Sequence, residues 1–181
     1  LWSKPNGVLI KAFTAQGNRL GVRSLDVDPA GKIVSGGGDG ETKLWGIGSD
    51  NIIGIFPKET NESEVLSVAF DAPSKYVAAG SADGTVRIFD PQTYLLVQTL
   101  TEHKDKVTAM AYSTNGKYFA TGSADSTIRI WDAQRYTLLQ ILRSNFGAIT
   151  SLSFHPTNPW LASTANGIGI WDVSTGVLRK T

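Results

Sequence analysis

The sequence predicts an all-β protein built from a repeated unit of four short antiparallel strands. Three observations in its 181 residues lead to this prediction. First, a short motif that ends in an aromatic residue recurs every 40 to 44 residues. Second, each repeat contains stretches of alternating apolar residues, which is the pattern of strands with one buried face. Third, no stretch keeps the 3.6-residue period of an amphipathic helix, and 19 glycines with a single methionine suit tight turns and short strands.

The recurring motif joins a basic or small residue, an aliphatic residue and an aromatic residue, usually followed by aspartate. Its aromatic residues are Trp2, Trp45, Phe89, Trp131 and Trp171. A period of about 40–45 residues with a Trp-Asp signature is the spacing of four-stranded propeller blades. The repeat predicts blades at 15–58, 59–101, 102–143 and 144–181, after the end of a preceding blade at 1–14.

Each unit begins with an alternating strand that lies well before its aromatic residue. These first strands are expected at 22–27, 65–70, 107–112 and 149–154. Turns rich in proline or in Asn-Gly follow, because proline fixes φ and Asn-Gly accepts positive φ. Second strands are expected at 32–35, 76–80, 118–122 and 160–163.

A turn containing aspartate then leads into the third strand, which ends on the aromatic residue of the motif. The fourth strand closes each unit and carries apolar residues. Fourth strands are expected at 7–13, 51–56, 95–100, 138–142 and 176–180.

The composition excludes several classes of site. The net charge is +1, whereas a surface for the nucleic-acid backbone carries a large positive excess, so direct nucleic-acid binding is not favoured. There is no cysteine, which excludes disulfides and thiolate metal sites. The two histidines, His103 and His155, have no metal-site spacing, and we expect no metal or cofactor. No apolar run approaches the about 20 residues of a membrane helix, so no membrane partner is expected.

Two catalytic interpretations compete with a structural one. Asp39, Asp83 and Asp125 could be taken as an acid cluster, and Thr121, His103 and Asp125 as a triad. Carboxylates that work as an acid–base pair must converge within several ångströms. These residues recur once per repeat, and radial repetition separates them. We therefore expect no catalytic residue.

The chain resembles the WD-repeat β-propellers over nearly its whole length. The third unit matches best, with Glu102-His103, then Thr121-Gly122-Ser123-Ala124-Asp125, then Ile130-Trp131-Asp132. The resemblance implies one propeller domain of four-stranded antiparallel blades, here about four blades and part of another. An open arc of four blades would expose apolar surface at both ends. The remaining blades are therefore expected from a longer chain or from other subunits.

The resemblance also implies a function. Members of this family are non-enzymatic scaffolds that hold partner proteins in larger complexes, so we expect protein or peptide partners and an intracellular location, cytoplasmic or nuclear. A substrate-recruiting or architectural subunit of a ubiquitin-ligase or RNA-processing complex is the alternative. An enzyme on a propeller scaffold is not favoured, because it would require reactive groups around the central channel and the sequence shows none.

The family's blades contain a hydrogen-bonded network of four residues. Carried over to the third unit, these are His103, Thr121, Asp125 and Trp131. Such a network is chemically reasonable because a buried carboxylate needs donors. The other units offer partial sets: Ser35, Asp39 and Trp45 in the first, Asp83 in the second, and Ser163 and Trp171 in the fourth. The second unit has Ala79 and Phe89 in place of the hydroxyl and the indole, so Asp83 is expected to depend on backbone donors.

Partners of the family dock mainly on the face made by the loops before the first strand and between the second and third strands. Carried over, this gives the candidate partner-binding residues Arg23, Glu64, Leu66, Lys106, Thr108 and Phe146. Small residues precede the turn aspartates, which implies a flat centre and favours a peptide or protein over a small molecule. Each candidate could instead be an ordinary solvated loop residue.

Overall fold

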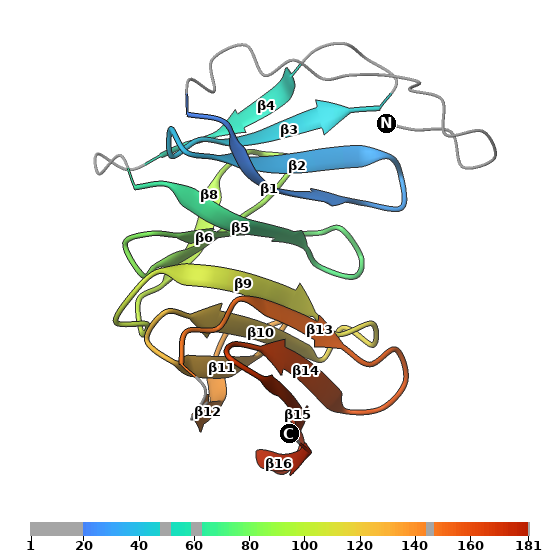
Figure 1. Ribbon diagram of the computed structural model, residues 1–181. Coiled ribbons are helices and arrows are strands. Elements are labelled where there is room, and N and C mark those ends of the chain that lie inside the picture. The colour runs from blue at the N-terminus through green and yellow to red at the C-terminus, as the bar shows by residue number, and fades with distance from the viewer. Residues whose placement is uncertain (1–19, 48–51, 59–62, 144–146, 181) are drawn as a thin grey trace, which may run out of the picture.

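The computed structural model describes residues 20–47, 52–58, 63–143 and 147–180, and these residues form strands, with no helix among them. The predicted strand at 7–13 and the predicted end of a blade at 1–14 lie outside this part of the chain. The strands form four antiparallel sheets, each a meander in chain order (Figure 1). We call these sheets the first to fourth blades.

The first blade contains β1 (Val22–Val27), β2 (Lys32–Gly37), β3 (Thr42–Gly46) and β4 (Ile52–Phe56). The second contains β5 (Val65–Phe70), β6 (Val77–Ser81), β7 (Val86–Phe89) and β8 (Leu96–Leu100). The third contains β9 (Val107–Tyr112), β10 (Tyr118–Ser123), β11 (Thr127–Asp132) and β12 (Leu138–Arg143). The fourth contains β13 (Ser151–Phe154), β14 (Trp160–Thr164), β15 (Ile168–Asp172) and β16 (Val177–Lys180).

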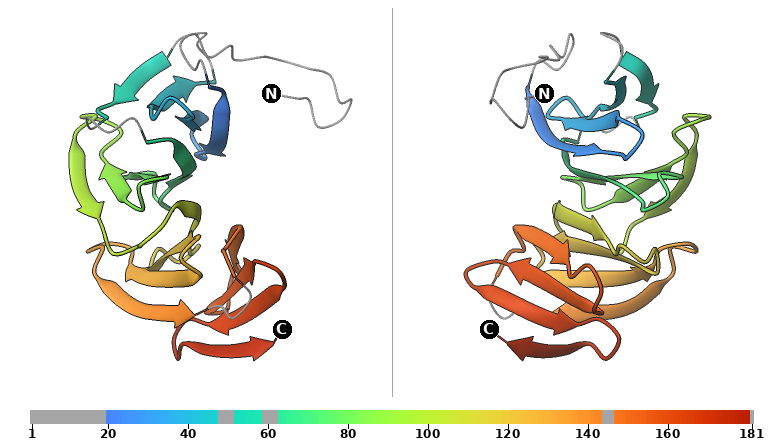
Figure 2. Two further views of the ribbon diagram at one scale, coloured as in Figure 1. Left: turned by 60° about the vertical axis from the view of Figure 1, so that its left-hand side comes forward. Right: turned by 90° about the vertical axis from the view of Figure 1, so that its right-hand side faces the viewer.

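The blades are arranged in an open arc. Their first strands, β1, β5, β9 and β13, line the concave side, and their fourth strands lie on the outside (Figure 2). The prediction of an all-β propeller that is not closed is therefore confirmed. Three strands begin one residue later than expected, namely β6 at Val77, β8 at Leu96 and β16 at Val177, and β13 begins two residues later, at Ser151 and not at 149. The Ile149 N–H donates to the Ser123 carbonyl oxygen of the third blade at 3.0 Å, which takes this residue out of its own sheet.

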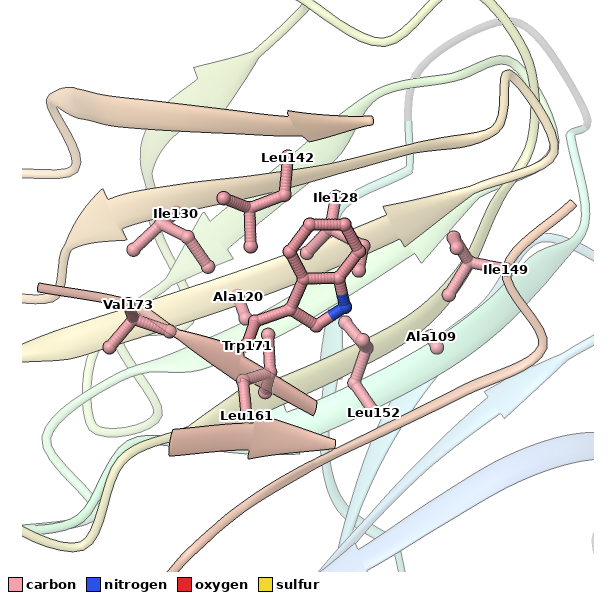
Figure 3. Packing of buried hydrophobic residues seen from close by; sticks show 10 residues of the cluster. All are labelled: Ala109, Ala120, Ile128, Ile130, Leu142, Ile149, Leu152, Leu161, Trp171 and Val173. Atoms are coloured by element: carbon pink, nitrogen blue, oxygen red, sulfur yellow. The ribbon is translucent and has the colours of Figure 1, made fainter. Parts of the chain in front are cut away.

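The hydrophobic core lies between blades. Figure 3 shows Trp171 and Leu161 of the fourth blade among Ile128, Ile130 and Leu142 of the third, and all five side chains are buried. Equivalent clusters join the first blade to the second and the second to the third. Each blade is therefore stabilised mainly by the apolar surface that it buries against its neighbours.

A column of glycines lets the blades approach one another. A Cβ on Gly36 would lie 2.5 Å from Val65 Cγ1, and a Cβ on Gly80 would lie 2.7 Å from Val107 Cγ1. Gly122 contacts Ile149 in the same way. The corresponding position of the fourth blade is Thr164, and no further described blade packs against it.

Replacement of Gly80 by valine is expected to destabilise the fold by about 1–3 kcal/mol, because the added carbons enter space that Val107 already fills. Denaturant unfolding measures the loss. The matched control is Thr164→Val in the same column, which should change stability by less than about 0.5 kcal/mol. Equal effects of the two substitutions would show that the glycines do not set the blade spacing.

Candidate partner-binding face

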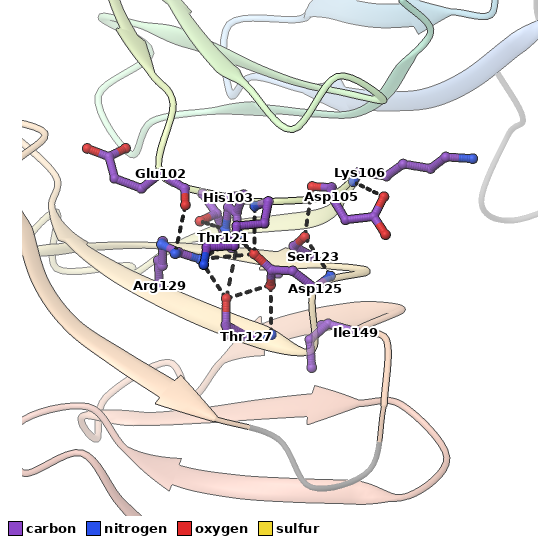
Figure 4. Close-up of polar contacts among 12 residues, drawn as sticks. Glu102, His103, Asp105, Lys106, Thr121, Ser123, Asp125, Thr127, Arg129 and Ile149 are labelled. Carbon is purple, nitrogen blue, oxygen red and sulfur yellow. Dashed lines mark hydrogen bonds and ion pairs between the residues drawn. The ribbon is translucent and has the colours of Figure 1, made fainter.

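The third blade holds the complete polar network, and Figure 4 shows its members His103, Thr121 and Asp125. His103 Nδ1 lies 2.9 Å from Asp125 Oδ2, and Nε2 lies 2.8 Å from Thr121 Oγ1. Trp131 Nε1 donates to the same Thr121 oxygen at 3.0 Å. Nδ1 also lies 2.7 Å from Arg129 Nη1, so the imidazole contacts both the carboxylate and the guanidinium. The four side chains form one chain of donors and acceptors from the indole to the carboxylate.

The electrostatics of this network keep His103 neutral and Asp125 ionised. Burial lowers the pKa of His103, and this effect outweighs the opposing attraction of Asp125. Burial acts to raise the pKa of Asp125, but donors from Thr127, the Lys104 N–H and His103 hold it far below its ordinary value. The two groups therefore lock the loop before β9 onto the turn between β10 and β11.

A fifth member of the network was not anticipated from the sequence. Arg129 Nη1 lies 3.2 Å from Asp125 Oδ2, and Nη2 donates to the Glu102 carbonyl oxygen at 2.8 Å. The same position holds Arg87 in the second blade, 3.0 Å from Asp83 Oδ2. These cations recur four residues after each turn aspartate, and their recurrence in the motif was the signal that could have identified them.

The other blades keep parts of the network. Trp45 Nε1 donates to Ser35 Oγ at 2.8 Å, and Trp171 Nε1 donates to Ser163 Oγ at 2.9 Å. In the first blade the cation is buried Lys43, whose Nζ lies 3.7 Å from Asp39 Oδ2 and 2.7 Å from Glu41 Oε2. The fourth blade has Gly169 in the cation's position.

The expectation for Asp83 was wrong in part. One of its oxygens accepts both the Thr85 N–H at 2.9 Å and the Thr85 hydroxyl at 2.7 Å, and the other faces the Arg87 guanidinium. Although burial acts in the opposite direction, these contacts lower the pKa of Asp83. Side-chain donors therefore replace the missing imidazole in the second blade.

These networks position a face made of loops. In three blades, the residue before the turn aspartate donates its N–H to the loop that precedes the first strand. The donor–acceptor pairs are Gly38 to Gly21 at 3.0 Å, Ala82 to Glu64 at 2.9 Å and Ala124 to Lys106 at 2.9 Å. The two loop types that were expected to form a docking face therefore touch in each of these blades. We call this surface the loop face.

Two predicted binding residues of the loop face are paired with each other. Arg23 Nη2 lies 2.9 Å from Glu64 Oε1, and the pair links the first blade to the second. Both side chains are substantially exposed. Lys106 is also exposed, and its backbone N–H donates to Asp105 Oδ1 at 2.7 Å. The loop face thus presents an ion pair beside a separate cation.

The remaining predicted binding residues differ in accessibility. Leu66 in β5 is half-buried. The Thr108 hydroxyl bonds to the Ile149 carbonyl oxygen and lies 3.2 Å from the Gly122 carbonyl oxygen, so it joins the third blade to the fourth. Phe146 lies outside the described residues.

Two sizeable hollows lie away from the loop face. A groove of about 650 Å³ follows the first strands along the concave side, where Ser24, Ser67 and Thr108 contribute to its lining. A second cavity of about 550 Å³ lies at the opposite end of the strands, beside Tyr76 and Tyr112. A hollow next to the loop face, lined in part by Lys58, holds only about 10 Å³. A loop face with so small a hollow beside it suits a broad contact with a protein or peptide better than an enclosed small molecule.

Within the described ranges, no three His, Cys, Asp or Glu side chains are grouped as metal ligands would be. None of the described residues lies in a helix long and apolar enough to cross a membrane.

Comparison with solved structures matches the arc to a known architecture. The crystal structure of the RRP9 WD40 repeats superposes with a TM-score of 0.83 at 20% sequence identity. The match covers 90% of this chain and 51% of the other. At this identity the similarity concerns the fold.

Two curated proteins show the range of sequence relatives. The Target of rapamycin complex subunit wat1 of Schizosaccharomyces pombe is 27% identical over 106 residues, which is 59% of this chain and 33% of that protein. The Probable di- and tripeptidase DUG2 of Saccharomyces cerevisiae is 34% identical over 97 residues, which is 50% of this chain and 11% of that protein. The chain thus spans a third or less of the length of these relatives.

The family profile described as "WD domain, G-beta repeat" matches residues 7–46, 50–90, 95–132 and 136–172. These four segments cover most of the sequence, and each ends at the aromatic motif or just after it. The chain belongs to the WD40 repeat family.

Proposed function

We propose that this chain is a non-enzymatic scaffold within an intracellular multiprotein complex and that it binds a partner protein or peptide through the loop face. The observation that carries the proposal is the pairing of the two loop types, which recurs at the same end of three successive blades. Membership of the WD40 family supports an interaction role, and one relative is by name a subunit of a complex. The relative named as a peptidase shares only a small part of its length with this chain and supports no activity here.

The residues that we assign to binding are Arg23, Glu64, Lys106 and Leu66. Arginine and large apolar side chains are among the groups that carry interface energy, whereas paired surface charges contribute little to folding. Substitution of Arg23, Glu64 or Lys106 should therefore change binding of the partner while leaving the folding stability of this chain nearly unchanged. Thr108 contributes less to binding in this proposal, because its hydroxyl already joins two blades.

Lys106→Glu is expected to weaken the affinity for the partner by about tenfold or more, which corresponds to about 1.4 kcal/mol of binding free energy. Affinity capture with the whole chain first identifies the partner, and titration calorimetry with the purified partner then measures each variant. The matched control is Lys117→Glu, at another exposed lysine, which lies in the turn between β9 and β10 at the opposite end of the strands.

Arg23→Glu should also weaken binding. The double variant Arg23→Glu with Glu64→Arg keeps an ion pair but exchanges the positions of its charges, so it tests whether binding depends on which position is positive. All variants should melt within about a degree or two of the parent, since exposed charges contribute little to folding. Equal loss in Lys117→Glu, or unchanged binding in Lys106→Glu and Arg23→Glu, would place the partner elsewhere.

A further inference from the structure

The cavity beside Tyr76 and Tyr112, which we call the tyrosine cavity, has a volume of about 550 Å³. This volume lies within the ~300–1,000 Å³ of typical ligand cavities. Its walls are the turns that follow β5, β9 and β11. These turns belong to the second and third blades, each of which has a described blade on either side. The cavity is therefore built by inner blades and does not depend on the ends of the arc.

Asp71 brings a buried carboxylate to this cavity. Its Oδ1 accepts the Tyr76 N–H at 2.8 Å, which closes the turn after β5, and the residue is 8% exposed. Asp83 and Asp125 each face an arginine, but no cationic group among the described residues forms an ion pair with Asp71. Burial raises the pKa of Asp71, and the opposing backbone N–H donors do not cancel this effect. The cavity thus contains a carboxylate that lacks a counter-ion.

Tyrosine rings form the apolar walls of the cavity. The Tyr112 ring stacks on Phe119 with the centroids 4.3 Å apart, and its hydroxyl lies 3.1 Å from that of buried Tyr136. Tyr76 packs edge to face on Tyr136 with the centroids 6.0 Å apart. Burial raises the pKa of Tyr112 and of Tyr136, and the negative charge of Asp71 adds to both effects. The rings are therefore held in place around a site that the carboxylate makes negative.

The ring of Tyr76 already attracts a cation of this chain. Lys75 Nζ lies over it, 4.7 Å from the ring centroid, and the Lys75 side chain is exposed. The negative face of an aromatic ring attracts cations in this way. Since Lys75 forms no ion pair with Asp71, the aromatic face and the carboxylate are not satisfied by one cation. Together they are complementary to an organic cation that can reach both.

We infer that the tyrosine cavity binds an arginine side chain of a partner protein, whose guanidinium pairs with Asp71 and stacks on Tyr76 in place of the Lys75 ammonium. A guanidinium is planar, stacks on aromatic rings, pairs with a carboxylate through two N–H groups and is less strongly hydrated than an ammonium. The exposed amides of Asn115 and Gln134 line the same cavity and offer hydrogen bonds to the backbone beside the arginine. This site lies at the opposite end of the strands from the loop face, so it is a second contact beyond the proposed function.

An NMR titration of the isotopically labelled chain with the tripeptide acetyl-alanyl-arginyl-alanine amide tests this inference. The peptide should shift the signals of residues 71–76 and 112–116. The same peptide with citrulline, which has the shape of arginine without its charge, should bind about tenfold more weakly. The lysine peptide should also bind more weakly than the arginine peptide, because an ammonium cannot stack.

Asp71→Asn removes the charge but keeps an oxygen for the Tyr76 N–H, so it should fold and should weaken binding of the arginine peptide about tenfold. The matched control is Asp28→Asn in the corresponding turn of the first blade. Asp28 is also buried, and its Oδ1 accepts the Lys32 N–H at 2.7 Å, but it does not line the tyrosine cavity. Asp28→Asn should leave the affinity for the peptide unchanged.

Lys75→Gln has the opposite expected effect. It removes the competing ammonium from the Tyr76 ring and should strengthen binding of the arginine peptide about threefold. A role of this cavity in folding alone would predict no gain in affinity.

The inference is overturned if the arginine peptide shifts none of these signals at millimolar concentrations, or if the citrulline peptide binds equally well. It is also overturned if Asp71→Asn strengthens binding while Lys75→Gln weakens it, because the cavity would then bind anions. Thermal melts show whether each variant is folded, and the comparison of the two peptides needs only the parent chain. None of these results bears on the loop face, which is tested separately.

Discussion

Trp131→Ala is expected to lower the free energy of unfolding by about 3–5 kcal/mol, the range for removal of a buried large aromatic side chain. The indole is 1% exposed and lies in the core cluster between the second and third blades, together with Ile88 and Phe119. The substitution opens a cavity at the contact that holds the arc together, and it leaves the Thr121 hydroxyl without its indole donor. Urea unfolding followed by circular dichroism measures the loss.

Two further variants separate packing from hydrogen bonding. The second blade has Phe89 and Ala79 where the third has Trp131 and Thr121, so the indole and the hydroxyl are absent together. Trp131→Phe keeps most of the packing, and combining it with Thr121→Ala should cost less than the sum of the two single changes, because no donor is then left without an acceptor.

Trp160→Ala is the matched control for Trp131→Ala. This half-buried indole starts β14 and packs against His155 and Arg179. Its removal should cost less than about 2 kcal/mol. If Trp131→Ala is no more damaging than Trp160→Ala, the core does not depend on the contact between the second and third blades.

The sequence was sufficient to predict the blades because two periods coincide in it. The repeat length sets where each aromatic residue falls, and the alternation of apolar residues marks the strands between. The first strands at 22–27, 65–70 and 107–112 have the bounds that the pattern predicts. The pattern was less accurate at the ends of strands. At Ile149, for example, it predicts a strand residue, but the Ile149 N–H donates to the Ser123 carbonyl oxygen of the neighbouring blade.

The contacts of individual polar side chains were less predictable. A basic residue before the aliphatic position is visible in the motifs of the first three blades, but periodicity does not show whether a long side chain points to solvent or folds back on an aspartate. Arg129 folds back, since Asp125 lies four residues earlier across the turn. For the same reason, the Thr108 hydroxyl could not be predicted to join two blades, because its acceptor belongs to a segment 41 residues away.

Asp125→Ala should cost about 3–5 kcal/mol of unfolding free energy, the range for breaking a buried charge pair by removing one partner. The change leaves the guanidinium of buried Arg129, a residue that is 7% exposed, without its carboxylate. It also removes the Asp125 contact of His103 Nδ1 and leaves the Lys104 N–H without its acceptor. Chemical denaturation of the full chain measures this loss. Asp83→Ala is the matched control in the second blade and should cost less, because its carboxylate is more exposed and faces no imidazole.

The decisive comparison is the double variant Asp125→Ala with Arg129→Met. Replacing a whole buried ion pair by apolar groups costs far less than removing one charge, so the double variant should be more stable than Asp125→Ala alone. The methionine keeps most of the length of the arginine stem while removing the unpaired cation. If the effects of the two single substitutions simply add, Asp125 does not serve to neutralise Arg129, and the imidazole and backbone contacts alone would account for its position in the turn.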